Sequence, residues 1–237
     1  MGKRIGTVVL RRAGRALVAL QTGIHAIDPT TGRLTRLADP VPDQYLRFND
    51  GKCDPAGRFW VGTFDMMQRL HAGTLYRFDP DGGTHVMLRR ITNSNGIAWS
   101  LDCTTMYYID MPTLVVQAFD YDHVTGHIAN LRVVIRIPEG SGGPDGMTID
   151  AEDQLWVALW GRVVYTVTTL APGHCCRSLR CPRRSLRRAL SAGRGSNPVY
   201  HHGAGRPHAA ASGRVSAQRR HFYGAAGRTG LFFWKVA

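Results

Sequence analysis

Similar segments recur along the first two thirds of the chain. DPAGRFWVGT begins at Asp54, LDCTTMYYID contains Asp102, and DAEDQLWVALW begins at Asp150, so the three aspartates are spaced 48 residues apart. Each segment is a polar turn followed by a short apolar strand that is rich in aromatic residues. Short strands, turn signals and a repeat of roughly 40–50 residues are typical of a β-propeller, in which each blade is a four-stranded antiparallel sheet.

The number of repeats predicts an incomplete ring. At this period, residues 1–161 hold about three blades, which are too few to close a propeller. The opening segments IGTVVL, ALVAL and IHAID are interpreted as three consecutive strands of one blade. A β-sandwich also has short strands and turns, but the regular spacing favours the propeller. The predicted fold class is therefore all-β, a partial propeller of about three blades.

The last third of the chain differs in charge. Residues 162–237 contain 14 Lys and Arg and no Asp or Glu, whereas residues 1–161 carry 16 basic and 17 acidic side chains. The formal net charge of +13 therefore comes from the tail alone. The repeat also stops at Gly161. We therefore divide the chain into a partial propeller, residues 1–161, and a basic tail, residues 162–237, that we expect to be disordered or irregular.

Three interpretations of this tail remain open. A GC-rich gene read out of frame yields Arg, Ala, Gly, Pro and Ser in quantity, so the first is a frameshift product. The second is a genuine basic tail that binds RNA or DNA through its charge. The third is a metal site built from His174, Cys175, Cys176 and Cys181, although their spacing matches no zinc pattern.

A second motif precedes each of the three turns. The chain reads NDG at 49–51, SNG at 94–96 and PDG at 144–146, which places Asp50, Asn95 and Asp145 directly before a glycine. Equivalent positions of successive blades lie around one axis, so these oxygens would converge there and suit a hard divalent cation. The competing explanation is a set of tight turns, in which Asn, Asp and Gly are common for backbone reasons.

At these motifs the chain resembles the senescence-marker-protein, regucalcin and gluconolactonase family. The similar segments occur in order between about residue 5 and Gly161, and they read YLRFNDGKCDPAGRFWVGT, SNGIAWSLDCTTMYYID, AFDYDHVTG and PDGMTIDAEDQLWVALWG. The resemblance implies a six-bladed propeller that hydrolyses sugar lactones with one divalent metal ion, Ca, Zn, Mg or Mn, on its axis. Residues 162–237 do not share the resemblance.

The resemblance also implies roles for four residues. Asn95 and Asp145 correspond to metal ligands of the family, and Asp145 also corresponds to its catalytic acid or base. Arg47 and Asn49, in the segment RFND, correspond to residues that hold the substrate. The expected function is metal-dependent hydrolysis of a sugar lactone, in which the cation activates water and polarises the carbonyl.

Two departures from the family's pattern lead us to expect impaired activity. A third metal ligand of the family is a Glu in a GEGP-like motif of the first blade, and this chain begins after that point. Some members also carry a substrate-contacting Glu shortly after WVGT, where this chain reads FDMMQ, with Asp65 as the only acidic residue. The alternative function is a propeller remnant that binds a cation or a sugar without catalysis and has a nucleic-acid-binding tail.

Other classes of protein find little support in the sequence. No apolar run is long enough to cross a membrane, and arginines interrupt the apolar N-terminal stretch, so we expect a cytoplasmic protein without a membrane partner. The chain has no nucleophile elbow, P-loop or GxGxxG motif, so an α/β-hydrolase or a nucleotide enzyme is unsupported. Trp60, Trp99, Trp156 and Trp160 could form a ligand platform, but tryptophans in strands more often pack between blades.

Overall fold

The computed structural model describes residues 4–11, 15–161, 164–168 and 177–180. These residues form sixteen strands in four sheets and one short 3₁₀-helix, η2, at Met111–Thr113. No helix in this part of the chain is long and apolar enough to cross a membrane. The all-β class predicted from the sequence is therefore confirmed.

Each sheet is a meander of four consecutive antiparallel strands. The first sheet contains β1 (Ile5–Leu10), β2 (Ala16–Leu20), β3 (Gly23–Ile27) and β4 (Leu34–Ala38). The second sheet contains β5 (Leu46–Cys53), β6 (Phe59–Asp65), β7 (Gly73–Phe78) and β8 (Thr84–Ile91).

The other two sheets repeat this order. The third contains β9 (Ser94–Trp99), β10 (Thr105–Asp110), β11 (Val115–Tyr121) and β12 (Ile128–Arg136). The fourth contains β13 (Gly143–Ile149), β14 (Leu155–Trp160), β15 (Val164–Thr168) and β16 (Arg177–Arg180).

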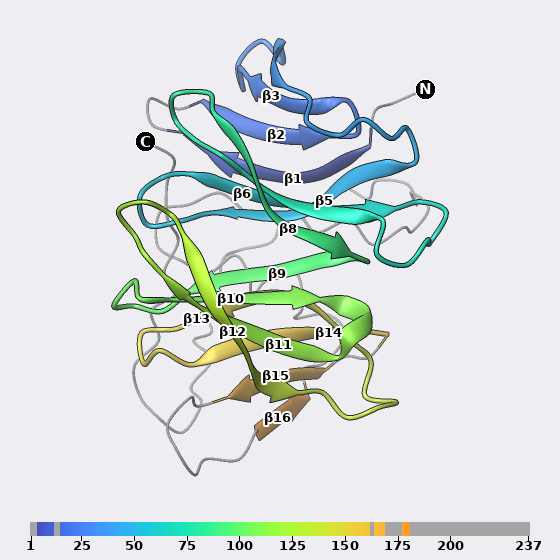
Figure 1. Ribbon diagram of the computed structural model, residues 1–237, viewed down its shortest axis with the longest axis vertical. Helices are drawn as coiled ribbons and strands as arrows, with labels where there is room; N and C mark the ends of the chain where they lie inside the picture. The colour runs from blue at the N-terminus through green and yellow to red at the C-terminus, as the bar shows by residue number, and fades with distance from the viewer. Residues whose placement is uncertain (1–3, 12–14, 162–163, 169–176, 181–237) are drawn as a thin grey trace, which may run out of the picture.

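The first strand of each sheet is also the innermost strand of the assembly. β5 contacts both β1 and β9, and β9 contacts β13, whereas the later strands of each sheet extend outward in order. The sheets therefore stack in chain order, from the blue first sheet at one end of Figure 1 to the brown strands at the other. Four-stranded meanders that share an axis through their first strands are propeller blades.

The sequence predicts about three blades, and the described residues form four. In the first sheet, β4 joins the three strands predicted from IGTVVL, ALVAL and IHAID and completes a four-stranded blade. The fourth sheet extends past Gly161, the predicted end of the propeller, because β15 pairs with β14 and β16 pairs with β15. The tail interpretations otherwise concern residues outside the described part, the cluster at 174–181 included.

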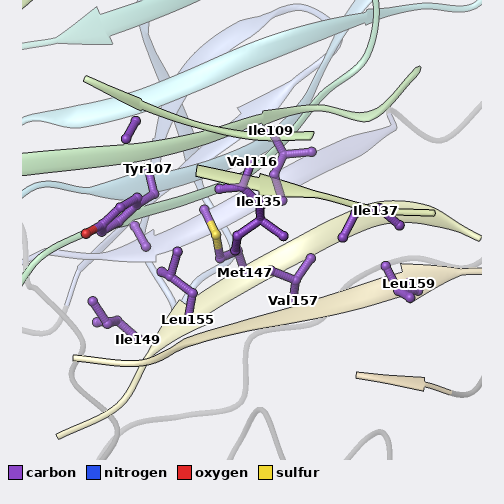
Figure 2. Close-up of a cluster of buried hydrophobic side chains, with 12 residues drawn as sticks. Tyr107, Ile109, Val116, Ile135, Ile137, Met147, Ile149, Leu155, Val157 and Leu159 are labelled. Carbon is purple, nitrogen blue, oxygen red and sulfur yellow. The ribbon is translucent and has the colours of Figure 1, made fainter. Parts of the chain in front are cut away.

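Three hydrophobic clusters fill the three spaces between neighbouring sheets. The first joins residues such as Leu17 of β2 to Phe59 of β6, and the second joins the second sheet to the third. In the second cluster the buried rings of Trp60 and Trp99 meet edge to face, with centroids 5.9 Å apart. The interpretation of these two tryptophans as blade packing is confirmed. Figure 2 shows the third cluster, in which Met147 of the fourth sheet lies among side chains of the third.

The turns after the innermost strands are equivalent, but not at the residues that the 48-residue spacing selects. Asp54, Ser100 and Asp150 each directly follow an innermost strand, and the carbonyl of each accepts a hydrogen bond from the amide three residues later. Asp102 lies two residues beyond Ser100 and accepts a hydrogen bond from its hydroxyl group at 2.6 Å. Equivalent turn residues are therefore 46 and then 50 residues apart. The prediction that Asp102 is equivalent to Asp54 and Asp150 is wrong, because Ser100 takes that position.

Candidate functional site

The four residues singled out from the sequence lie at the beginnings of innermost strands. Arg47 and Asn49 are in β5, Asn95 is in β9 and Asp145 is in β13. Near these positions the pairing of each innermost strand with the next strand of its own sheet is interrupted. Such irregularities release groups from the hydrogen-bond ladder and redirect side chains. The local structure thus frees this end of the blades for a site.

A series of hydrogen bonds joins three of the four residues. The Arg47 guanidinium donates to the Asn49 side-chain oxygen at 3.2 Å. The Asn49 amide nitrogen donates to the Ser94 carbonyl oxygen at 2.8 Å and approaches the Asn95 Oδ1 atom at 3.4 Å. The structure therefore brings the predicted substrate-binding residues of the second sheet against the predicted metal ligand of the third.

A glycine brings the fourth residue, Asp145, to the same place. A Cβ atom on Gly96 would lie 2.7 Å from the Asp145 carbonyl oxygen and 2.6 Å from the Met147 Cβ atom. These distances are too short for any side chain, so only glycine permits this approach of β9 to β13. Since Gly96 follows Asn95 directly, the two oxygen-bearing residues come from adjacent strands that touch.

Lys52 is a site component that the sequence analysis misses. Its ammonium group donates a hydrogen bond of 2.8 Å to the carbonyl oxygen of Met147, two residues after Asp145. Burial lowers the pKa of Lys52, and the nearby charge of Asp50 partly opposes that shift. The strand LRFNDGKC already contains Arg47, Asn49 and Asp50, so no local sequence signal distinguishes Lys52. Its partner on a distant strand is set by the fold alone.

Asp50 lies within β5, where the pairing of this strand with β6 is interrupted. Its Oδ1 atom accepts a hydrogen bond of 2.8 Å from the amide of the following residue, Gly51. The NDG, SNG and PDG motifs lie within β5, β9 and β13, so the interpretation of them as tight turns is wrong. Within the NDG motif, the hydrogen-bonded series described above runs through Asn49 and not through Asp50.

The end of β6 forms one wall beside Arg47. The Arg47 guanidinium lies over the ring of Phe64, with its Cζ atom 5.0 Å from the ring centroid. The buried Asp65 carboxylate points elsewhere, because it accepts hydrogen bonds from the Met67 amide at 2.7 Å and from Arg69 at 2.6 Å. The only acidic residue of FDMMQ is thus fully engaged in holding its own loop.

The donor set suits a hard cation but is small. Asn95 is buried, and the 3.4 Å approach of Asn49 to its Oδ1 atom is long for a hydrogen bond, so that oxygen keeps capacity for a further partner. Amide and carboxylate oxygens are the ligands that Ca²⁺ and Mg²⁺ prefer. No group of three or more His, Cys, Asp or Glu among the described residues could hold a metal ion. The side chains of Asn95 and Asp145, an amide and a carboxylate, are of the chemical kind that an oxygen-coordinated cation takes.

Known proteins share this arrangement of motifs. Residues 1–193 match the model of the family described as "SMP-30/Gluconolactonase/LRE-like region". The chain belongs to this family. The match extends beyond Gly161, where the resemblance stops in the sequence analysis, and it includes the segments that form β15 and β16.

The family's curated members are matched over part of their length. Regucalcin from Danio rerio is 42% identical over 166 residues, which are 68% of this chain and 56% of that protein. A "putative sugar lactone lactonase YvrE" from Bacillus subtilis is 44% identical over 152 residues, which are 63% of this chain and 52% of that protein. The chain thus spans about half the length of the curated relatives it matches.

Solved structures of the family have the same architecture. A luciferin-regenerating enzyme aligns with a TM-score of 0.71 and 29% identity, over 77% of this chain and 64% of that one. A regucalcin from Agrobacterium tumefaciens, described as a calcium-binding protein, aligns with a TM-score of 0.66 and 28% identity, over 71% and 58%. The partial β-propeller predicted from the sequence is confirmed.

Proposed function

We propose that this chain is built to hydrolyse a sugar lactone with the help of a divalent metal ion. The observation that carries the proposal is the hydrogen-bonded series from Arg47 through Asn49 to Asn95, with Asp145 on the adjoining strand. Membership of the gluconolactonase-like family supports the reaction class, and the name of the Bacillus subtilis relative supports the substrate class.

Each residue has a role that its position allows. A divalent ion held by Asn95 and Asp145 would polarise the lactone carbonyl and make a water molecule more acidic. The Asp145 carboxylate accepts the proton of the attacking water and returns it to the ring oxygen that leaves. Arg47 and Asn49 hold the carbonyl or the hydroxyl groups of the sugar through directional hydrogen bonds. The contact of Asn49 with Asn95 fixes the substrate-binding side chain relative to the metal-binding one.

We also propose that the activity is impaired relative to the family. The described residues offer one carboxylate and one amide to the cation, and a Ca²⁺ ion takes roughly six to eight oxygen ligands. Water would therefore supply most of the oxygen ligands around the cation. A smaller number of charged protein ligands lowers the affinity of the site for the cation. In addition, Asp65 is bound to Arg69 and gives no contact to a sugar hydroxyl.

The test is acid release from D-glucono-1,5-lactone by the purified full chain in the presence of Ca²⁺, Mg²⁺, Mn²⁺ or Zn²⁺. We expect slow, chelator-sensitive hydrolysis that Asp145→Asn reduces at least about 100-fold, since general-base removal typically costs that much. Asp81→Asn, in an exposed turn between β7 and β8, is the matched control. Equal rates for Asp145→Asn and the wild type would show that Asp145 is not the base.

The same sample separates the enzyme from a binding protein. If metal-dependent binding of D-gluconate is measured by calorimetry and no lactone is opened, the alternative of a non-catalytic cation- or sugar-binding propeller is correct. Calcium binding that survives Asn95→Ala together with Asp145→Asn would exclude these two residues as ligands in either case.

A further inference from the structure

Two arginines lie together beside the proposed site. Arg4 directly precedes β1, and Arg47 is in the adjoining innermost strand, β5. The two strands approach so closely that a Cβ atom on Gly6 would lie 2.4 Å from the Phe48 carbonyl oxygen. Consistent with this proximity, burial and then the positive charge of Arg4 lower the pKa of Arg47.

Neither guanidinium group has a carboxylate partner among the described residues. Arg47 donates only to neutral oxygens of its own strand, and Arg4 directs a nitrogen to the Met66 sulfur at 3.4 Å. By contrast, Arg69 is ion-paired with two aspartates and Arg77 is ion-paired with Asp79. The sequence outside the described residues contains no Asp or Glu that could neutralise the pair.

The surroundings of the pair favour an anion over a cation. Phe64 covers one face of the Arg47 guanidinium, and Met66 contacts Arg4, so the nearest neighbours from the second sheet are neutral. The Asp65 carboxylate lies between these residues in sequence but faces Arg69. Two adjacent guanidinium groups without a local counterion attract carboxylate or phosphate, which they bind through charge-assisted hydrogen bonds.

We propose that Arg4 and Arg47 together bind an anionic group, carboxylate or phosphate, carried by the sugar lactone at a position away from its reacting carbonyl. This inference rests on the proposed function and refines its substrate class from a neutral sugar lactone to an acidic one. Arg4 lies outside the hydrogen-bonded series that joins Arg47 to Asn95, so it is not needed to position the reacting groups. Its role in this proposal is to distinguish anionic lactones from neutral ones. Because Arg4 is exposed, a substitution there leaves the core intact.

The kinetic test compares three lactones on the full chain. D-glucono-1,5-lactone is neutral, D-glucaro-1,4-lactone carries a carboxylate, and 6-phospho-D-glucono-1,5-lactone carries a phosphate. In Arg4→Gln we expect the ratio of kcat/KM for an anionic lactone to kcat/KM for the neutral one to fall about five- to tenfold, the usual effect of a partly exposed charged hydrogen bond. The anionic lactone whose ratio falls identifies the group that is bound.

A matched control and a salt series complete this test. Arg33→Gln removes an exposed arginine from the turn between β3 and β4 and should leave the ratio unchanged. Raising ionic strength should lower the ratio in the wild type more than in Arg4→Gln, because salt screens exposed charges. If Arg4→Gln leaves both ratios within about twofold of the wild type, the inference is wrong.

A binding measurement separates this inference from the proposed function. Calorimetry with D-glucitol, D-glucuronate, whose carboxylate is on C6, and D-glucitol 6-phosphate needs no hydrolysis. If no lactone is opened but an anionic ligand binds the wild type at least about fivefold more tightly than it binds Arg4→Gln, the lactonase proposal fails and the anion site stands. If neither anionic ligand binds more tightly than D-glucitol, the anion site is refuted whether or not lactones are opened.

Discussion

The ammonium group of Lys52 donates a hydrogen bond of 2.8 Å to the carbonyl oxygen of Met147 and so links the second sheet directly to the fourth. The innermost strand of the third sheet, β9, contacts both β5 and β13, so this hydrogen bond spans the inner edge of three blades. The carbonyl belongs to the strand that carries Asp145. A half-buried cation is thus tied to the strand that supplies the proposed base.

Lys52→Met should change how stability depends on pH. The folded protein holds the pKa of Lys52 below its ordinary value of 10.5, so between the two pKa values the unfolded chain binds the extra proton. The free energy of unfolding of the wild type should therefore rise relative to that of Lys52→Met as pH increases toward 10.5. Urea unfolding of both proteins at several pH values measures the difference. A difference that stays constant with pH contradicts this expectation.

Gly126→Ala should destabilise the interface between the second and third sheets. Gly126 has φ +68°, and a Cβ atom there would lie 2.6 Å from Arg77 Nη1 and 2.7 Å from Arg58 Cζ. Both arginines donate to carbonyl groups of this same turn, so displacing them breaks those hydrogen bonds. We expect a loss of about 2–3 kcal/mol in urea unfolding, from backbone strain and overpacking together.

Gly32→Ala is the matched control for that substitution. Gly32 has φ +70° in a turn with the same hydrogen bond to an aspartate carbonyl four residues earlier, but nothing lies within 4 Å of its Cβ position. Its cost should be the strain alone, about 1 kcal/mol. Equal losses for the two glycines would mean that the arginines move away freely.

Asp54→Asn should destabilise the fold more than Asp102→Asn does. The buried Asp54 Oδ2 atom accepts hydrogen bonds from Arg58 at 2.6 Å, Tyr121 at 2.7 Å and Trp60 at 3.0 Å. An amide in its place leaves the buried Arg58 without a counterion, and breaking such a pair costs about 3 kcal/mol or more. Asp102 lies in the exposed part of the corresponding turn, so its replacement should cost less. Thermal unfolding that ranks the two in the opposite order would refute this account.

Cys53 should be inert to alkylating reagents in the folded protein. Burial, and then the charge of Asp54, raise the pKa of its thiol well above the usual range, so the reactive thiolate is scarce. Cys103 is only partly buried and should be labelled first. Timed iodoacetamide treatment followed by peptide mass spectrometry gives the order, and denaturation in urea should make the two labelling rates similar. Prompt labelling of Cys53 before unfolding would contradict its burial.

Local patterns are sufficient to predict the elements of the fold. The strands and turns at 54–63 and 150–160 follow from short apolar runs rich in aromatic residues and from turn chemistry, which act over a few residues. The family resemblance assigns Asn49 and Asn95 to one site, and a close approach of their side chains joins them. The count of blades is low because it divides residues 1–161 by the repeat, whereas β15 and β16 of the fourth sheet lie beyond Gly161.

Contacts between sheets could not be predicted from the sequence. Asp102 matches the repeat by spacing, yet Ser100 occupies the equivalent structural position, because the distance between successive turns varies along the chain. The partners of Lys52 and Arg4 lie on segments 95 and 62 residues away, and such pairs depend on how whole sheets stack. The sequence alone does not show which charged side chains lack a counterion in the folded protein.

Since each sheet is a meander of four consecutive strands, no blade in the described residues needs a later segment to complete it. Loop closure within a blade spans short sequence distances, which favours rapid formation. During synthesis, a blade is able to form as soon as its fourth strand leaves the ribosome, and it then offers an apolar face on which the next blade condenses. The order of translation and the order of assembly therefore coincide.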